Sequence, residues 1–253
     1  MKIAQATPRC GPPSWKYLDS LVQWTDYTAR ARPELGVQFL RIERYLPIDV
    51  ARNALVDRFL ESDADYLWFV DQDAAFLPGT LDRLLSRRLP IVSALEMMRL
   101  PGACYPMALK GPHATEAGQY RIQAPEIYEF VARSAYDATI NEPQMLPDTP
   151  QDSLLEVGFT GCHCLLIRRD VVAEMERPWF QGYDPGGEDQ YFCEKAFEMG
   201  TPTYVDLSVV VGHATTDRTI GLLDFMSAHR FLAEKQALET QEAAAAPREW
   251  RGA

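Results

Sequence analysis

The sequence predicts an α/β fold with a mixed, mostly parallel sheet and helices on both of its faces. Strand-like and helix-like segments alternate over residues 2–95, which is typical of a parallel sheet because each crossover lays a helix on the sheet. The clearest strand covers residues 66–70, where five apolar or aromatic residues run without interruption into Asp71 and Asp73. These two observations predict the α/β fold class.

The elements of the first half follow in order. Ser14 suits the N-cap of a helix that runs to about Arg32, and Pro78 suits the first turn of a later helix. Between them, residues 48–59 predict an amphipathic helix, because apolar residues recur at helical spacing and charged ones take other faces. Strands are expected over residues 2–7, 36–42, 66–70 and 90–95.

Residues 101–152 differ, because they are rich in proline and poor in periodic patterns. A long irregular segment in a compact domain is usually functional or mobile, so this one is either part of a substrate-binding region or lid, or a plain insertion. Within it we expect short strands over 107–110 and 120–123 and a surface loop over 135–153. Beyond it we expect strands over 154–157, 162–167 and 203–211, and helices over 169–176, 188–199 and 220–242.

Composition narrows the class of protein. The chain has 253 residues, which suits one large domain or one domain with an appendage. Its net charge of −11 disfavours nucleic acid as a substrate, since polyanion-binding proteins usually carry a basic patch. No apolar run approaches the roughly 20 residues that span a bilayer, and no signal peptide is evident, so a cytoplasmic location is expected.

The first candidate site is Asp71-Gln72-Asp73, directly after the aromatic strand. In open α/β sheets, ligands bind at the carboxyl ends of the strands. Two neighbouring carboxylates repel each other unless a cation or a proton lies between them. A divalent ion that holds a diphosphate would satisfy both conditions, whereas the alternative is an ordinary surface turn, which aspartate also favours.

Two later segments carry further candidates. His213 follows an apolar strand and Gly212, at what would be another strand end, and neutral imidazole suits Mn²⁺ and similar ions. Glu188 and Asp189 follow two glycines and open a helix, where either carboxylate could take a proton from an attacking hydroxyl. The alternative for this pair is plain stabilisation of the helix N-terminus. We favour Asp189 over Glu188.

The number and spacing of the cysteines do not favour a metal centre formed by cysteines. Five cysteines without a regular spacing favour reduced thiols over disulfides. The Cys162-His163-Cys164 segment invites a zinc interpretation, but the further ligands that tetrahedral zinc needs are absent from the neighbouring sequence. We therefore expect Cys162 and Cys164 to lie buried on one face of a strand.

Taken in order, these segments resemble the nucleotide-sugar-dependent glycosyltransferases of the GT-A fold, closest to the broad family 2 type. The resemblance covers about residues 2–215. It rests on Ala6-Thr7-Pro8, Ile48 to Leu55, Trp68 to Asp73, Gly158 to Gly161, Gly187 to Gln190, and Gly212-His213. It implies a GT-A domain over residues 1–219, with a nucleotide-binding half over 1–100, an acceptor and metal half over 101–219, and a helical tail over 220–253.

The resemblance also implies roles for individual residues. Thr7 and Arg9 would lie near the base, and Arg52 and Asn53 near the nucleotide or its phosphates. Asp71 and Gln72 would belong to the donor site, with Asp71 by the ribose or a metal-bound water. Asp71, Asp73 and His213 would form the group around Mn²⁺ or Mg²⁺, with Asp73 binding directly. The acidic pair Glu188 and Asp189 would supply the base of an inverting enzyme, although a histidine ligand also occurs in retaining members.

The expected reaction moves a sugar from a nucleotide-sugar, with UDP-sugars favoured on family frequency, to an acceptor hydroxyl. The acceptor stays open among a glycan, a lipid-linked sugar, a small molecule, a protein and, with less support, a modified nucleic acid. Two other classes compete. One is a phosphohydrolase with an aspartyl-phosphate nucleophile, which also uses D-x-D after a strand. The other is a non-catalytic domain that binds a nucleotide-sugar or a glycan.

Overall fold

The computed structural model describes residues 1–8, 10–42, 46–100, 103–109, 124–182, 187–215 and 218–230. The strands are β1 Lys2–Ala6, β2 Gly36–Leu40, β3 Tyr66–Val70, β4 Ala74–Ala75, β5 Ile91–Leu100, β6 Ala103–Pro106, β7 Ala108–Leu109, β8 Gln144–Met145, β9 Leu154–Val157, β10 Phe159–Thr160, β11 Cys164–Arg168, β12 Thr203–Ala214 and β13 Thr219–Ile220. The helices are α1 Trp15–Ala31, α2 Ile48–Glu61, α3 Thr80–Ser86, α4 Ala124–Arg133, α5 Arg169–Glu174 and α6 Glu188–Glu198, and residues 222–230 form a further helix.

The main sheet is mixed and has the strand order β13-β12-β5-β11-β3-β1-β2. Strands β2, β1 and β3 run parallel, as the alternation of strands and helices predicts. Strand β11 enters antiparallel between β3 and β5, and β12 then pairs parallel with β5. The sheet therefore has parallel parts on either side of one reversed strand.

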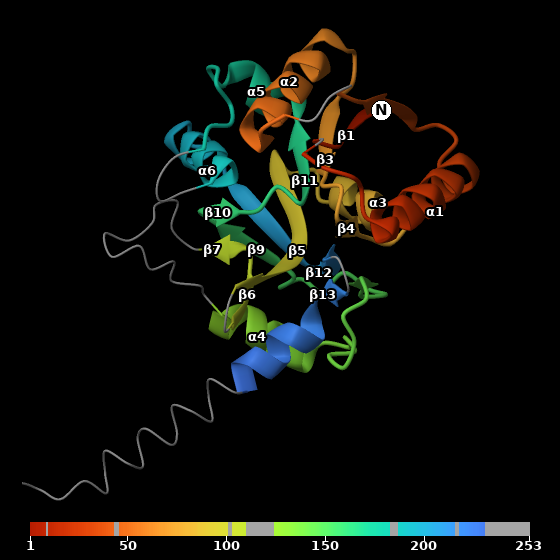
Figure 1. The fold of residues 1–253 in the computed structure, drawn as a ribbon, viewed down its shortest axis with the longest axis vertical. Helices are drawn as coiled ribbons and strands as arrows, with labels where there is room; N and C mark the ends of the chain where they lie inside the picture. Colours follow the sequence, from red (N-terminus) through yellow and green to blue (C-terminus); the bar gives the residue numbers. More distant parts are fainter. Residues whose placement is uncertain are drawn as a thin grey trace, which may run out of the picture.

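Helices cover both faces of this sheet (Figure 1). On one face, α2, α5 and α6 bury apolar residues such as Phe59, Val172 and Phe192 in a common core. On the other face, α1 and α3 pack against the sheet around Trp68, whose ring contacts Trp24 and Phe76 edge-on at centroid distances of 4.9 and 5.4 Å. A third cluster joins α4 and the helix over 222–230 at the far end of β12.

Local sequence accounts for the ends of the helices. Ser14 caps α1, because its Oγ accepts a hydrogen bond of 3.1 Å from the amide of Tyr17. Helix α6 gives way to Gly200, whose φ of +70° lies in the left-handed region that glycine adopts without strain. Both helix boundaries agree with the sequence to within about a residue.

Several expectations need correction. Helix α4 was not expected, and β5 continues to Leu100 rather than ending near Leu95. Cys162 and Cys164 are both buried but lie on opposite faces of the sheet, because β11 begins only at Cys164 and a turn precedes it. The expected strand over 120–123 and the helical residues beyond 230 lie outside the described part of the chain.

Candidate active site

The site lies where the carboxyl end of β3 meets β11 and β12. The amide of Asp71 donates to the carbonyl of His163 at 3.0 Å, which ties the end of β3 to the turn before β11. The carbonyl of Asp73 accepts from the amide of Ala214 at 2.8 Å, and β4 pairs antiparallel with β12. These backbone bonds bring three segments that are distant in sequence to one place.

Asp73, His163 and His213 form a compact group of ligand atoms, all within 4.8 Å of one another. Nε2 of His213 lies 3.2 Å from Oδ2 of Asp73, and Nδ1 of His163 lies 3.5 Å from Oδ1 of the same carboxylate. Ligand atoms around an ion with bonds of about 2.1 Å lie roughly 3.0–3.5 Å apart, so the spacing suits a divalent cation. The structure thus brings together Asp73 and His213, as the sequence predicts, and adds His163.

The buried ring of His163 is held in a specific orientation. Its Nε2 lies 3.2 Å from the carbonyl oxygen of Gly212, to which it donates, so the Nδ1 lone pair points the other way. That lone pair faces Asp73, Asp71 at 3.8 Å and Glu96 at 3.9 Å. A lone pair among carboxylates is repelled unless a cation lies between them, and a backbone carbonyl behind the ring is the usual support of a metal-binding histidine. The donor set therefore fits a metal ion.

The pKa values of Asp73, His163 and His213 do not all shift in the same direction. Burial alone would raise the pKa of Asp73, but the hydrogen bond from His213 and the charges of His163 and His213 together outweigh burial and hold this pKa below its usual value. Burial alone would lower the pKa of His213, but the same bond and the charges of Asp73 and Asp71 together raise it. Burial and the neighbouring His213 lower the pKa of His163, which keeps this imidazole neutral and able to bind a metal.

Arg52 of α2 bridges two carboxylates beside this group. Its Nη2 lies 3.0 Å from Asp71 and its Nε 3.1 Å from Glu188, while the guanidinium packs over the rings of Phe69 and Phe180. The side chain is only 3% exposed. Burial alone would lower the pKa of Arg52, but the charge of Asp71, together with those of Cys162 and Glu188 and the hydrogen bond to Asp71, outweighs burial and raises the pKa well above the usual value. The arginine is therefore a permanent buried cation.

The two acidic residues at the start of α6 have different surroundings. Glu188 is engaged by Arg52, whereas no described cation pairs with Asp189. Desolvation, with a contribution from the charge of Glu188, raises the pKa of Asp189 from 3.8 to about 7. A carboxyl group with this pKa can accept or release a proton near neutral pH.

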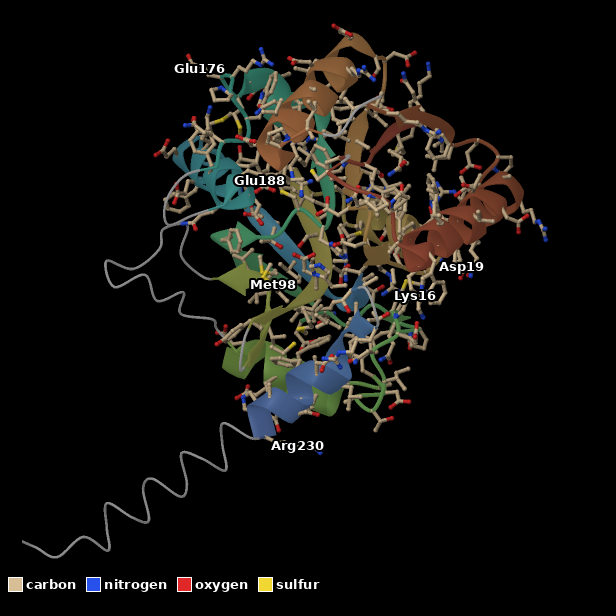
Figure 2. All side chains as sticks on the ribbon, viewed as in Figure 1. Lys16, Asp19, Met98, Glu176, Glu188 and Arg230 are labelled. Atoms are coloured by element: carbon tan, nitrogen blue, oxygen red, sulfur yellow. The ribbon has the colours of Figure 1, made fainter. Side chains whose placement is uncertain are left out.

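A cavity of about 470 Å³ connects these groups. His163, His213, Arg52 and Asp189 line it, together with Glu188 of α6 and Met98 of β5, both labelled in Figure 2. Its further lining residues are Ile48, Asp71, Glu96, Tyr105, Pro106, Met107, Phe159, Cys162, Gly187 and Gln190. One part of the wall is thus charged and the remainder largely apolar.

A second cavity of about 300 Å³ borders the same Asp71–Asp73 segment, at Gln72. Thr7, Tyr17 and Gln72 line it, and Arg41 packs over the ring of Phe39 at its edge, 5.7 Å from the ring centre. The hydroxyl of Thr7 bonds to Tyr17 at 2.7 Å, and the carboxamide of Gln72 pairs with both backbone groups of Gly11 in the orientation that satisfies both. Thr7 and Gln72 therefore lie beside a cavity that could receive a flat group.

The side chain of Asn53, an expected ligand residue, points into the protein. The side chain of Asn53 is used within the protein: it donates to the carbonyls of Asp49 and Phe180 and accepts from the amides of Trp179 and Phe180. These bonds occupy both of its donors and its acceptor within the protein. They fix the loop after α5. Arg9 lies outside the described residues.

Two residues of the site were not identified from the sequence. His163 lies between two buried cysteines, in a segment that resembles an ordinary core strand. Glu96 is 4% exposed, and burial, followed by the charges of Asp71, Asp189 and Asp73, raises its pKa well above the usual value. The only sequence indication was one carboxylate within the apolar run from Ile91 to Met98.

Among the described residues, no helix is both long and apolar enough to cross a bilayer. No protein-family model matches the sequence, and no similar sequence is found among curated proteins.

Solved structures do match the fold. The protein A197 from STIV matches with a TM-score of 0.54 at 17% identity, over 88% of this chain and 92% of its own. GalNAc-T7, crystallised with UDP, GalNAc and Mn²⁺, gives 0.48 at 11% identity, over 84% of this chain and 43% of its own. A mutant of Drosophila β-1,4-galactosyltransferase 7, crystallised with manganese, UDP-Gal and xylobiose, gives 0.41 at 15% identity, over 87% of this chain and 69% of its own.

At these identities the likeness concerns the fold alone. The similar structures named here are A197 and two glycosyltransferases, and this chain has a mixed α/β sheet with a parallel core flanked by helices.

Proposed function

We propose that this protein is a metal-dependent glycosyltransferase that moves a sugar from a nucleotide-sugar to an acceptor hydroxyl. One observation carries the proposal: His163 and His213, which with Asp73 form a cation-binding group, line the same cavity as Asp189, a carboxyl group with a pKa of about 7. Sugar transfer needs both parts, one to stabilise the departing diphosphate and one to take a proton from the acceptor.

The two cavities suit an elongated donor. Both border the segment from Asp71 to Asp73, with Asp71 lining one cavity and Gln72 the other. A nucleotide-sugar bound across this segment would place its base beside Thr7, Tyr17 and Phe39. Its diphosphate would lie at the metal group and its sugar in the larger cavity. UDP-sugars are favoured.

Asp73, His163 and His213 would hold the ion, and Asp71 would support it from beside the ribose or a metal-bound water. Two imidazoles in the donor set favour Mn²⁺ over Mg²⁺, which prefers oxygen ligands. The bound ion would act as a Lewis acid that offsets the charge on the departing diphosphate. Arg52 would add a fixed positive charge next to Asp71.

We assign the role of base to Asp189. Arg52 binds Glu188, so Asp189 is the acidic residue of this pair that faces the cavity without a described cation. It would take the proton of an acceptor hydroxyl that attacks the sugar from the face opposite the diphosphate, which inverts the anomeric centre. The acceptor itself would be a glycan, a small molecule or another hydroxyl-bearing group.

A thermal-shift panel of nucleotide-sugars, with and without Mn²⁺, tests the proposal. A donor that binds the folded state raises the melting temperature by mass action, and we expect the largest shift for a UDP-sugar in the presence of Mn²⁺. Incubation of that donor with candidate acceptors should then give a glycoside of inverted configuration by NMR.

Two results would overturn the proposal. Steady metal-dependent release of phosphate from a generic phosphomonoester would favour a phosphohydrolase. Tight donor binding without transfer to any acceptor and without donor hydrolysis would identify a binding domain. Retention of configuration in the product would leave the transferase standing and remove the assignment of Asp189 as base.

A further inference from the structure

Glu96 is the one carboxyl group of the cavity whose function the proposed reaction does not explain. It lies in the middle of β5 and lines the cavity floor, although only 4% of the residue is exposed. Its Oε2 is buried and has no hydrogen-bond partner among the described residues. A buried acceptor without a hydrogen bond destabilises the folded protein, so its presence at this position calls for a reason.

Gly161 makes room for this carboxyl group. A Cβ atom at position 161 would lie 1.8 Å from Oε1 of Glu96, far inside any allowed contact. Any other residue there would push the carboxyl group out of its place. The turn before β11 and the side chain from β5 are therefore matched to each other.

Three other acidic groups at the site already have cationic partners, and the proposed reaction gives Asp189 the role of base. Asp71 and Glu188 bind Arg52, and Asp73 binds His213. Glu96 does not belong to the compact metal group, which consists of Asp73, His163 and His213. Unlike Asp71, Asp73 and Glu188, it lacks a cation in hydrogen-bond contact within the described chain.

A second unmet group lines the same cavity. Nη1 of Arg52 is buried without a hydrogen-bond partner in the described part of the protein. Arg52 can only donate, whereas a carboxyl oxygen accepts. A ligand that satisfies both groups must offer a donor to Glu96 and an acceptor to Arg52. A hydroxyl group can act as either. Met98, Tyr105 and Phe159 supply apolar wall nearby, which suits the C–H faces of a sugar ring.

We propose that Glu96 binds a hydroxyl group of the transferred sugar and thereby helps to select which sugar is accepted. The inference rests on the proposed function. Glu96 lies near the metal group on one side, 3.9 Å from Nδ1 of His163, and borders the same cavity as Asp189. In the proposed reaction, the transferred sugar occupies the space between the diphosphate and the base.

The test compares binding of a nucleoside diphosphate with binding of its sugar derivatives. Isothermal titration with Mn²⁺ present would use UDP, UDP-glucose, UDP-galactose and their two N-acetylhexosamine counterparts. We expect Glu96→Met to weaken the preferred UDP-sugar at least tenfold while the affinity for UDP changes less than twofold. Glu96→Gln, which keeps the shape, should lose less and should change the order of preference among the four sugars.

Gly161→Ala provides a second route, because it displaces the carboxyl group without removing it. It should reproduce the selective loss for UDP-sugars. Glu198→Gln, at the exposed end of α6, is the matched control and should bind every ligand as the parent does. Melting curves of all four variants report folding, and loss of an unmet buried carboxyl group should not lower the melting temperature.

Three results with the Glu96 variants would overturn the inference. Equal weakening of UDP and the UDP-sugars would place Glu96 at the nucleotide. Weaker Mn²⁺ binding without nucleotide would place it in the metal group. Unchanged donor binding with slower transfer would place it at the acceptor. A parent that binds UDP with Mn²⁺ but gains nothing from any sugar refutes the inference alone, whereas a parent that binds neither refutes the proposed function itself.

Discussion

Nε2 of His213 lies 3.2 Å from Oδ2 of Asp73, although the two residues come from opposite halves of the chain. The pairing of β4 with β12 places them there, because it sets Ala74 opposite His213. On the other side of β12, Gly212 permits close packing of β13, since a Cβ at that position would lie 2.5 Å from Cγ2 of Thr219. The backbone pairing of β4 with β12 thus sets the positions of Asp73 and His213 relative to each other.

Replacement of Asp73 by Asn should abolish the dependence of nucleotide affinity on Mn²⁺. The change removes a charged ligand but keeps its size, so the fold should persist. Titration of UDP with and without Mn²⁺ would measure the effect. Asp19→Asn on the exposed face of α1 is the control. Equal Mn²⁺ dependence in the Asp73 variant and the parent would contradict the proposed metal group.

Replacement of His163 by Gln should weaken Mn²⁺ binding even without nucleotide. Loss of a direct ligand should cost at least the roughly 10–100-fold in affinity that loss of a supporting residue costs. Direct titration of the free protein with Mn²⁺ would show it, and His229→Gln, on the helix over 222–230, is the matched histidine control. If both variants bind Mn²⁺ like the parent, His163 has only a structural role.

The residues that the sequence identified share one property: each follows a recognisable strand or opens a recognisable helix. Asp71 and Asp73 end an unbroken apolar run, and His213 ends another. In an α/β sheet such ends converge, so a local pattern was enough. The fold class followed from the same alternation of elements.

The residues that it missed depend on contacts between distant segments. His163 reaches the site only because β11 inserts antiparallel between β3 and β5, and no local pattern records that insertion. Asn53 looked like a ligand from its motif, but the loop at Trp179 and Phe180 occupies its side chain. For both His163 and Asn53, contacts between distant segments determine where the side chain lies.

Arg52 shows the limit of amphipathic patterns. As a charged residue it was assigned to a polar face of α2, yet it shares the buried face with Val56 and Phe59. The spacing of these three residues is helical and would have indicated the burial. Its two carboxylate partners, which make that burial tolerable, come from β3 and α6 and were not predictable locally.

Replacement of Arg52 by Met should destabilise the fold. It leaves Asp71 and Glu188 without their shared cation, at a cost of about 3 kcal/mol, the lower end of the range for buried pairs because both carboxylates keep some exposure. Urea unfolding followed by tryptophan fluorescence would measure the free energy of unfolding. Arg30→Met removes only an exposed pair with Asp26 and should have almost no effect. Equal stability of the two variants would mean that the buried bridge is not needed.

Replacement of Asp189 by Asn should separate activity from stability. If Asp189 is the base, the rate of sugar transfer should fall by about 10²–10⁴-fold. The folded pKa of about 7 lies above the ordinary 3.8, so ionisation of Asp189 opposes folding. The contribution of Asp189 to the stability of the parent is therefore fullest below about pH 4 and declines as the pH rises toward 7, whereas the Asn variant lacks this contribution to the pH dependence.

The difference in stability between the Asn variant and the parent should thus be small near pH 4, grow through pH 7 and level off above it. Each pKa unit corresponds to about 1.4 kcal/mol, so the gain at pH 8 amounts to a few kcal/mol at most. Melting curves of the metal-free proteins at pH 4, 6 and 8 would measure it. Glu188→Gln should do the opposite and destabilise, because it breaks the ion pair with Arg52. A parallel pH profile for parent and Asn variant would show that Asp189 titrates normally, and full transfer activity in that variant would assign the base elsewhere.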